Sequence, residues 1–258
     1  MKAKVIRLWF VALVVFLSLP ARAQTADASE NRFDALAKSI APIIALLTPA
    51  GHAGNHALDA EAIIAAVSGL PAEMSGARVH VAFEFPDKLL VQFPTAATTA
   101  TICRDRQTVW AFPAAQFSPL VEKVGVDIST TPLPPFQIDE TKAVLLPALF
   151  DVHDAGFVQL NNQSYRVLDV RLVGQSKTKK RTAGWPVRLW IQPQDHRVAQ
   201  IELRSSDWSA TLAIEKLDLA PTLPAAIWQP KPEQHDQIMA VPGDKMGSLL
   251  ELSLKRNK

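Results

Sequence analysis

The sequence predicts an α+β fold with an antiparallel sheet, and three observations support this prediction. Residues 78–93 alternate between apolar and polar side chains, which is the period of strands that bury one face. Strand signals of the same kind return after Gly156 and continue to residue 217. Before and between these two blocks, apolar residues recur at helical spacing in short stretches that contain prolines, so short kinked helices are expected there. Helices set apart from runs of strands are typical of the α+β class.

The first block of strands lies between Arg78 and Pro113 and carries aromatic side chains on its apolar face. Strands are predicted at residues 78–85, 88–93, 101–103 and 107–112, with a Pro86-Asp87 turn between the first two. The apolar face of the first two strands consists of Val79, Val81, Phe83, Phe85, Leu89, Val91 and Phe93. Such a face either packs as an ordinary core or lines an apolar cavity, and alternation alone does not decide between the two. An odd slip in register would turn the opposite face inward.

Helical spacing of apolar residues predicts helices at residues 33–47 and 113–124. Capping signals predict two more, at residues 59–68 and 139–150. Pro42 lies inside the first pattern and is expected to kink that helix or to split it into two short helices. Pro147 is expected to kink the last helix in the same way. Asp59 and Asp139 are suitable N-caps for the helices at residues 59–68 and 139–150.

The second block of strands occupies residues 157–217. Strands are predicted at residues 157–160, 164–173, 185–192, 198–204 and 208–217, with Asn161-Asn162 as the turn between the first two. Residues 220–232 are rich in proline and are expected to close the domain. Residues beyond Glu233 show no pattern that predicts a structure.

The first 23 residues have the pattern of a cleavable secretory signal peptide. Lys2, Lys4 and Arg7 give a basic start, residues 8–19 are an apolar run, and Ala21-Arg22-Ala23 is a small-x-small cleavage site. With Arg22, this segment contains four basic residues and no acidic one, so its removal changes the formal net charge from +2 to −2. A nearly neutral chain gives no support for nucleic-acid binding, which normally requires a basic face.

Cys103 is the single cysteine, so no disulfide can form within the chain. No cysteine follows the expected cleavage site, so the mature N-terminus is not expected to be lipidated there, and the protein is predicted to be exported in soluble form. Cys103 itself lies between apolar residues on a predicted strand, as a buried inert thiol does. Arg104 beside it could lower its pKa, which leaves a nucleophilic cysteine as the alternative.

The sequence gives little support for metal or catalytic chemistry. His52 and His56 are four residues apart, but nearby glycines disfavour the helix that would place both imidazoles on one face. Asp151, His153 and Asp154 could supply three ligands, although capping and turn roles suffice to explain them. The sequence has no Gly-x-Ser-x-Gly elbow, no glycine-rich phosphate loop and no His-Glu-x-x-His helix. No catalytic residue, metal ligand or cofactor is therefore predicted, and the chain is not expected to be an enzyme.

A dense basic run, Lys177-Thr178-Lys179-Lys180-Arg181, lies between two predicted strands. It is either a solvated loop or an electrostatic contact with anionic lipid headgroups or an acidic partner. In such a contact each basic residue would contribute about 1 kcal/mol of binding free energy near an anionic surface.

Two stretches in the first block resemble the periplasmic outer-membrane lipoprotein carrier family, the LolA-like proteins. In residues 102–113 a strand reaches a polar turn at Asp105 and continues into a strand with Trp110 and Phe112. This is similar to that family's strand, Asp-Gly-Lys-Thr-type turn and Leu/Val-Trp-aromatic strand. Phe85-Pro86-Asp87-Lys88 resembles the turn that precedes an aromatic-rich strand in the same family.

The C-terminal half resembles the same family. Residues 197–217 and then Ala226-Ile227-Trp228-Gln229-Pro230-Lys231-Pro232 are similar to its closing order of strand, polar turn, strand and Phe-x-Phe-x-x-Pro end. Together the matches cover most of residues 78–232, in order. Phe85 and Arg106 stand where the family usually has an arginine and a glycine, which leaves open a specialised relative of the carrier.

The resemblance implies an unclosed, half-wrapped antiparallel β-barrel whose concave face is capped by short, proline-kinked helices. It assigns residues 1–23 to a signal peptide and residues 24–75 to an N-terminal helical segment of the same domain. Residues 76–232 would form the LolA-like half-barrel, and residues 233–258 a C-terminal tail.

The function implied by the resemblance is that of a soluble periplasmic carrier, which shields acyl chains in an apolar cavity during transfer toward the outer membrane. Its partners would be an acylated lipoprotein or another lipid, an inner-membrane release complex and an outer-membrane acceptor; it would be a monomer and bind no nucleic acid. The helices with Pro42, Pro119 and Pro147 are the expected lids. The residues expected to line the cavity are Val79, Val81, Phe83, Phe85, Leu89, Val91, Phe93, Trp110, Phe112, Leu189 and Leu212.

The alternative is a regulatory or scaffold module of the same fold, which binds a partner protein or a lipid signal without transport. Its cavity would be small and filled by its own side chains. Loss of a partner after changes at surface residues such as 179–181, with no requirement for lipid, would indicate this alternative.

Overall fold

The chain folds into an antiparallel sheet of 11 strands, in the order β11-β5-β4-β3-β2-β1-β10-β9-β8-β7-β6. The computed structural model describes residues 31–48, 54–95, 98–124, 132–137, 150–172, 186–205, 207–246 and 249. The strands are β1 (Ala57–Ser68), β2 (Arg78–Glu84), β3 (Lys88–Pro94), β4 (Thr99–Asp105), β5 (Thr108–Phe112), β6 (Phe150–Leu160), β7 (Gln163–Leu172), β8 (Val187–Ile191), β9 (Val198–Arg204), β10 (Ser209–Ala220) and β11 (Met239–Ala240). The helical elements are α2 (Arg32–Leu47), α3 (Ala114–Val124) and the short 3-10 helices η1 (Ala72–Met74), η3 (Ala225–Trp228), η4 (Pro232–Gln237) and η5 (Gly243–Lys245).

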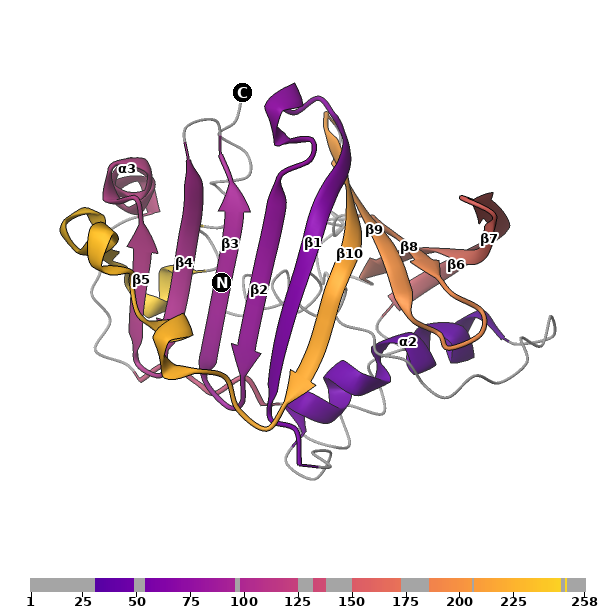
Figure 1. Ribbon diagram of the computed structural model, residues 1–258, viewed down its shortest axis with the longest axis horizontal. Helices are drawn as coiled ribbons and strands as arrows, with labels where there is room; N and C mark the ends of the chain where they lie inside the picture. Colours follow the sequence, from indigo (N-terminus) through magenta and orange to yellow (C-terminus); the bar gives the residue numbers. More distant parts are fainter. Residues whose placement is uncertain are drawn as a thin grey trace, which may run out of the picture.

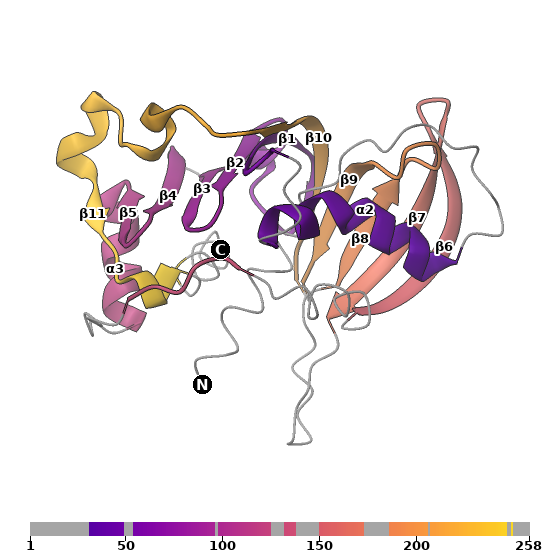
Figure 2. The same cartoon turned by 90° about the horizontal axis from the view of Figure 1, so that it is seen from below.

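Strands β1 and β10 pair in the middle of the sheet and join its two halves. β11 extends one half beyond β5, β6 is the edge of the other half, and the strand order does not close into a ring. The sheet curves, and α2 lies across the strands of the β6–β10 half (Figures 1 and 2). The predicted fold class, an α+β fold with an unclosed antiparallel half-barrel, is confirmed.

Residues 59–68, which were expected to form a helix, form most of strand β1 instead. Leu58, Ala60, Ala62 and Ile64 are buried and alternate with less buried side chains, which is the period of a strand. The stretch is rich in alanine, which favours helices, but pairing with β2 on one side and β10 on the other overrides that preference. The helix prediction is wrong because partners far away in the sequence decide the conformation here.

The first helix is confirmed, but Pro42 does not split it. α2 begins after Asn31, whose side-chain Oδ1 accepts a hydrogen bond from the Phe33 N–H at 3.0 Å, and it continues through Pro42 to Leu47. Ile40 and Ile43, on either side of the proline, are only 2% and 1% exposed. Packing on both sides of Pro42 therefore keeps the two parts of the helix in one element.

The helix predicted after Pro113 is confirmed as α3. Of the helix predicted at residues 139–150, only Phe150 is described, and it begins strand β6. The signal peptide, His52 and the basic run at residues 177–181 also lie outside the described residues.

The strands predicted in the second block are confirmed as β6 to β10, although β6 begins seven residues earlier than the expected Phe157. Asn161 and Asn162 form the predicted turn between β6 and β7, with φ angles of 50° and 60° that asparagine tolerates better than most residues. Asp151, His153 and Asp154, for which capping and turn roles were expected, lie within β6. The tail adds η4, β11 and η5 to the structure.

Candidate functional site

The candidate site is the inner face of the sheet, which is the face covered by α2. Nine of the eleven residues predicted to line a cavity belong to one apolar cluster on this face. Seven of them are buried, namely Val79, Val81, Phe83, Leu89, Phe93, Leu189 and Leu212. The other two, Phe85 and Val91, are partly buried and pack against the same cluster. The inner face is therefore a continuous apolar surface that runs from the first half of the sheet into the second.

Trp110 and Phe112 are on the opposite, outer face, so their assignment to the cavity is corrected. Trp110 pairs with Cys103 of β4 and joins a separate apolar cluster, while its neighbours Val109 and Ala111 face inward. Both faces of β4 and β5 carry apolar residues, because the outer one is covered by the chain after residue 220. A pattern of period two cannot identify the inward face when both faces are apolar.

Helix α2 covers the inner face over the second half of the sheet (Figure 2). Its buried side is apolar except at Ser39, whose hydroxyl donates a hydrogen bond to the Leu36 carbonyl within the helix at 2.8 Å. The buried residues of α2 belong to the same apolar cluster as Leu189 and Leu212. The helix is therefore an amphipathic cover that contacts the inner face through apolar side chains.

Residues 132–137 belong to the cover over the first half of the sheet. The Phe136 ring meets the Phe83 ring edge to face, with centroids 5.8 Å apart. The Phe136 N–H donates a hydrogen bond to the Pro86 carbonyl at 2.6 Å, and the Leu133 N–H donates one to Gln107 Oε1 at 2.8 Å. This cover is held by polar contacts as well as by apolar ones.

Arg104 contacts the 132–137 segment from the inner face of the sheet, a role that differs from the one considered for it beside Cys103. Its side chain shares the inner face with Leu89, its partner on β3, and is 5% exposed. The guanidinium donates hydrogen bonds to the carbonyls of Pro134 and Arg106, both at 2.8 Å, and lies 4.5 Å from the centroid of the Phe136 ring. Burial lowers the pKa of Arg104, while the nearby Asp87 carboxylate acts in the opposite direction. The only sequence signal for this contact is the presence of an arginine at an inward position of an apolar strand.

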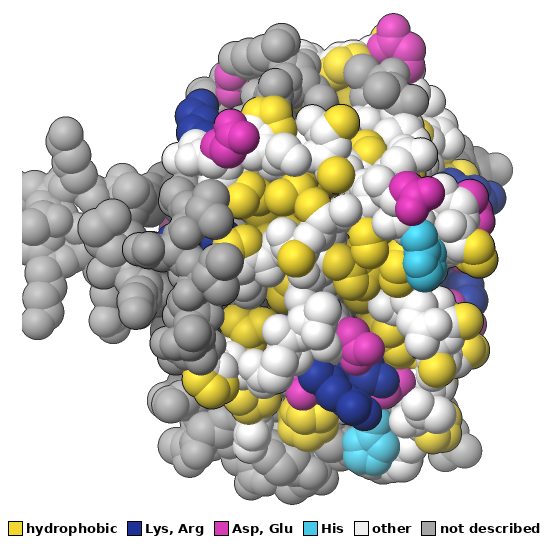
Figure 3. Space-filling view, turned by 90° about the vertical axis from the view of Figure 1, so that its left-hand side faces the viewer, with side chains coloured by type: hydrophobic (Ala, Val, Ile, Leu, Met, Phe, Trp, Pro, Cys, Tyr) yellow, Lys and Arg dark blue, Asp and Glu magenta, His cyan; other side chains and the backbone are white. Residues whose placement is uncertain are grey.

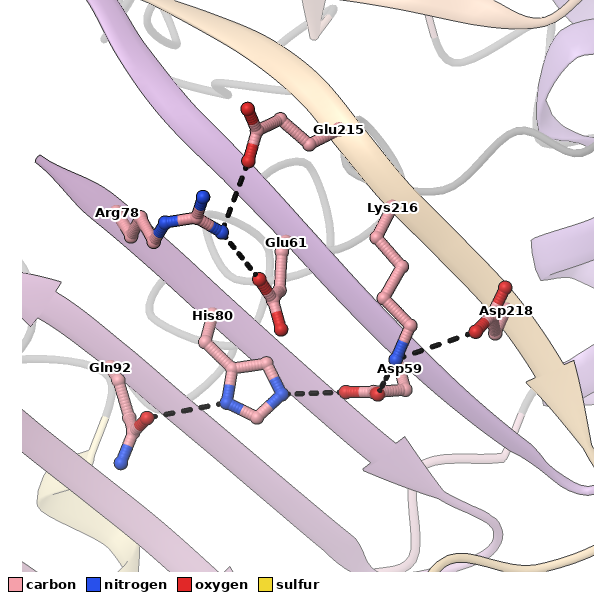
Figure 4. Close-up of polar contacts among 8 residues, drawn as sticks. All are labelled: Asp59, Glu61, Arg78, His80, Gln92, Glu215, Lys216 and Asp218. Carbon is pink, nitrogen blue, oxygen red and sulfur yellow. Dashed lines mark hydrogen bonds and ion pairs between the residues drawn. The ribbon is translucent and has the colours of Figure 1, made fainter. Parts of the chain in front are cut away.

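On the outer face, β10, β1, β2 and β3 carry a network of polar side chains (Figure 4). Asp59 Oδ1 lies 2.6 Å from His80 Nε2, and its other oxygen accepts a hydrogen bond from Lys216 Nζ at 2.5 Å. His80 Nδ1 is 3.2 Å from Gln92 Oε1, which extends the network to a fourth strand. Burial by itself raises the pKa of Asp59, but the hydrogen bonds with Lys216 and His80 outweigh it and hold the pKa below its ordinary value of 3.8. The network ties the central strands together across their outer side.

Replacing Asp59 by asparagine tests this network through its pH dependence. Because the folded-state pKa is lowered, the stabilisation is complete above the ordinary value of 3.8 and is lost as the pH falls through the lower folded value. We expect Asp59→Asn to reduce the free energy of unfolding by about 1–2 kcal/mol at pH 7 and the difference from wild type to shrink below pH 3.8. Urea unfolding at a series of pH values measures both. Asp218→Asn is the control, since Asp218 is 63% exposed and lies 3.4 Å from Lys216, so its effect should stay within about 0.5 kcal/mol. A pH-independent difference for Asp59→Asn would contradict the assignment.

Cys103 is buried in the outer apolar cluster and is 0% exposed. Burial, together with the charge of Asp105, raises its pKa to about 12. The neighbouring Arg104 does not lower this pKa, because its side chain is on the other face of the strand. The thiol is protonated at neutral pH, so the structure does not support a nucleophilic role for Cys103.

A segment after residue 220 crosses the outer face and is fixed there by hydrogen bonds. The Trp228 carbonyl accepts hydrogen bonds from Trp110 Nε1 at 3.2 Å and from Cys103 Sγ at 3.5 Å. The Leu223 N–H and the Thr222 hydroxyl donate to Glu84 Oε2, each at 2.9 Å. Within the part of the chain that the structure describes, the inner face therefore carries the larger of two apolar clusters, and the smaller one lies on the outer face under this segment.

Among the described residues, no group of three or more His, Cys, Asp or Glu side chains is arranged to hold a metal ion. In the same residues, no helix has both the length and the apolar character needed to cross a membrane.

The sequence matches no protein-family model, and no curated protein matches it. Among solved structures, the lipoprotein LppX of Mycobacterium tuberculosis is similar over 68% of this chain and 95% of its own, at 10% identity and a TM-score of 0.34. A putative outer membrane lipoprotein-sorting protein domain from Vibrio parahaemolyticus covers 67% of this chain and 88% of its own, at 11% identity and a TM-score of 0.30. The Pseudomonas aeruginosa MucA/MucB complex contains a chain that covers 82% of this one and 64% of its own, at 9% identity and a TM-score of 0.37.

At such low identities and TM-scores, these neighbours carry no argument about the function of this chain. The function proposed for this chain rests on the geometry of its own inner face.

Proposed function

We propose that the chain is a periplasmic binding protein for acyl chains, which holds the lipid part of a lipoprotein or another lipid against the inner face of its half-barrel. The observation that carries this proposal is the continuous apolar inner face, which spans both halves of the sheet and is covered by α2 and loops rather than by a second sheet. Transfer of ~14 methylene groups out of water provides about 11 kcal/mol at ~0.8 kcal/mol each, so such a surface binds acyl chains without covalent chemistry. Carriage of the lipid toward the outer membrane is the corresponding role.

The cover has to move for a ligand to enter, since Phe83 and Leu189 are each only 1% exposed. Helix α2 is the better candidate for the part that moves, because its buried side contacts the sheet through apolar side chains. An acyl chain can replace these contacts with equivalent ones, so the exchange costs little free energy. Residues 132–137 are held by hydrogen bonds to Arg104 and Gln107, and an acyl chain cannot replace those.

Val91 provides a test of the site that does not disturb the most buried core. Val91 is only partly buried, and threonine has nearly the same shape. We expect Val91→Thr to weaken acyl-chain binding roughly tenfold. Burying a hydroxyl against a lipid chain without a hydrogen bond costs about 1–3 kcal/mol of binding free energy. Titration with a fluorescent fatty acid measures the change. Glu61→Gln on the outer face is the control and should bind as the wild type does; equal affinities for all three proteins would contradict this site.

A second candidate function is a partner-binding regulatory module, and one observation favours it. The inner face is filled by the chain's own side chains, as expected for a module that does not take up lipid. The two candidates differ in whether the closed inner face opens to a ligand.

Native mass spectrometry of the protein purified gently from the periplasm distinguishes these functions. Acylated species that co-purify and disappear on denaturation, or uptake of an added lipopeptide, are the expected result. A clean mass of the unliganded protein, with no uptake of added lipopeptide, would overturn the acyl-chain proposal and favour the partner-binding module.

A further inference from the structure

The end of the β6–β7 hairpin extends past the neighbouring strands. β8 pairs with β7 from Arg166 to Val170, whereas β6 and β7 continue to pair with each other for three further residue pairs, to Leu160 and Gln163. Figure 2 shows this end reaching beyond the loop that joins β8 and β9. The hairpin end is therefore a two-stranded projection at one edge of the sheet.

The hairpin end exposes apolar side chains on both of its faces: Val158 lies in the projection, and Phe157 lies at its base, opposite Arg166. Phe157 is 55% exposed and Val158 is 43% exposed, and they are the exposed large apolar residues among those that the structure describes. Because consecutive residues of a strand point to opposite faces, the two side chains reach solvent on opposite sides of the hairpin. At the other edge, where β5, β11 and α3 lie, apolar side chains also reach the surface (Figure 3), but those of β11 are a half-buried Met239 and the small Ala240.

The hairpin end carries no charge. From Ala155 to Tyr165 the sequence contains no Asp, Glu, Lys, Arg or His. The polar groups of the end are also partly paired within it: the Tyr165 hydroxyl donates a hydrogen bond to Gln163 Oε1 at 2.6 Å, and the backbones of the two strands pair as far as the turn. Moving this end into a less polar environment therefore requires no desolvation of an ionised group.

We infer that the end of the β6–β7 hairpin inserts into the membrane–water interface of a lipid bilayer. A protein partner would dock on one face of the hairpin, whereas a bilayer surrounds both faces and so accounts for apolar side chains on both. Charge along the hairpin begins at Arg166, the cross-strand partner of Phe157, whose guanidinium lies 2.7 Å from the Asp154 carboxylate. β6 is an edge strand, and unpaired backbone groups are not tolerated in the hydrocarbon core, so the insertion is confined to the interface. This membrane contact is a property separate from acyl-chain binding and adds to the proposed function.

Flotation with phospholipid vesicles tests the inference on the full chain. The vesicles contain phosphatidylethanolamine and phosphatidylglycerol, and the proteins are the wild type, the double variant Phe157→Ser/Val158→Ser, and the control Gln159→Asn on the same strand. We expect the wild type and the control to float with the vesicles and the double variant to float several-fold less. Equal flotation of the double variant, or no flotation of the wild type, would overturn the inference.

A labelling experiment keeps the test valid if the double variant folds poorly. Cys103 is fully buried, so a thiol-reactive, environment-sensitive dye can be placed selectively at Val158→Cys or at the exposed control Asp218→Cys. The emission at position 158 should shift to shorter wavelength when the same vesicles are added, and that at position 218 should not. No shift at position 158 would overturn the inference. Fatty-acid binding measured without vesicles reports on the proposed function separately, and the hairpin variants should leave it unchanged.

Discussion

Replacing Phe83 by alanine should reduce the free energy of unfolding by about 3–5 kcal/mol. Phe83 is 1% exposed, belongs to the apolar cluster of the inner face and packs edge to face against Phe136 of the cover. The substitution removes a large apolar side chain and leaves a cavity between the sheet and residues 132–137. Since a typical domain is stable by only about 5–15 kcal/mol, the loss is a large fraction of the total. The midpoint of urea or guanidinium unfolding measures it.

Phe157→Ala is the matched control for this prediction. The same residue type is removed, but Phe157 is 55% exposed, so its replacement should change the free energy of unfolding by less than about 1 kcal/mol. Similar values for the two variants would show that Phe83 is not part of a packed core between sheet and cover. They would also remove the basis for treating residues 132–137 as a cover of the inner face.

Strand alternation predicted most of the sheet because one face of each strand is clearly more apolar than the other. This holds for β2, β3 and β8, where the residues predicted to face inward do so. It fails for β1, where alanines at buried positions match a helix as well as a strand. In β1 the choice is made by pairing with β10, whose residues come about 150 positions later in the sequence.

Contacts between distant parts of the chain also explain the errors in predicting the candidate site. Trp110 and Phe112 were placed on the wrong face because the outer side of β5 is also apolar, covered by a segment that contains Trp228. Only the folded chain shows that this segment returns to β5. The contact of Arg104 with the cover could not be predicted for a related reason: its acceptors include the Pro134 carbonyl, 30 residues away on a proline-rich segment.

Arg104 stabilises the cover over the first half of the sheet, although it is a buried cation. Its hydrogen-bond acceptors are the backbone carbonyls of Arg106 and Pro134, which would lose a charged donor if the guanidinium were removed. Arginine suits this position better than lysine, because its planar group donates to two carbonyls and also stacks on Phe136. The side chain thus connects β4 to residues 132–137 and, through Phe136, to Phe83.

Replacing Arg104 by methionine, which preserves length but removes charge and donors, should lower the free energy of unfolding by about 2–4 kcal/mol. The Leu133 and Phe136 amides, which donate to Gln107 and Pro86, should exchange with solvent faster than in the wild type. Arg104→Lys should recover only part of the loss, because one ammonium group cannot reproduce both the hydrogen bonds and the stacking. Arg78→Met is the control, since Arg78 is 62% exposed and its ion pairs lie on the outer face; its effect should stay below about 1 kcal/mol. If Arg104→Met left the exchange of Leu133 and Phe136 unchanged, the hydrogen bonds to Gln107 and Pro86 and the apolar contacts of Phe136 would hold residues 132–137 without Arg104, and its assigned role would be wrong.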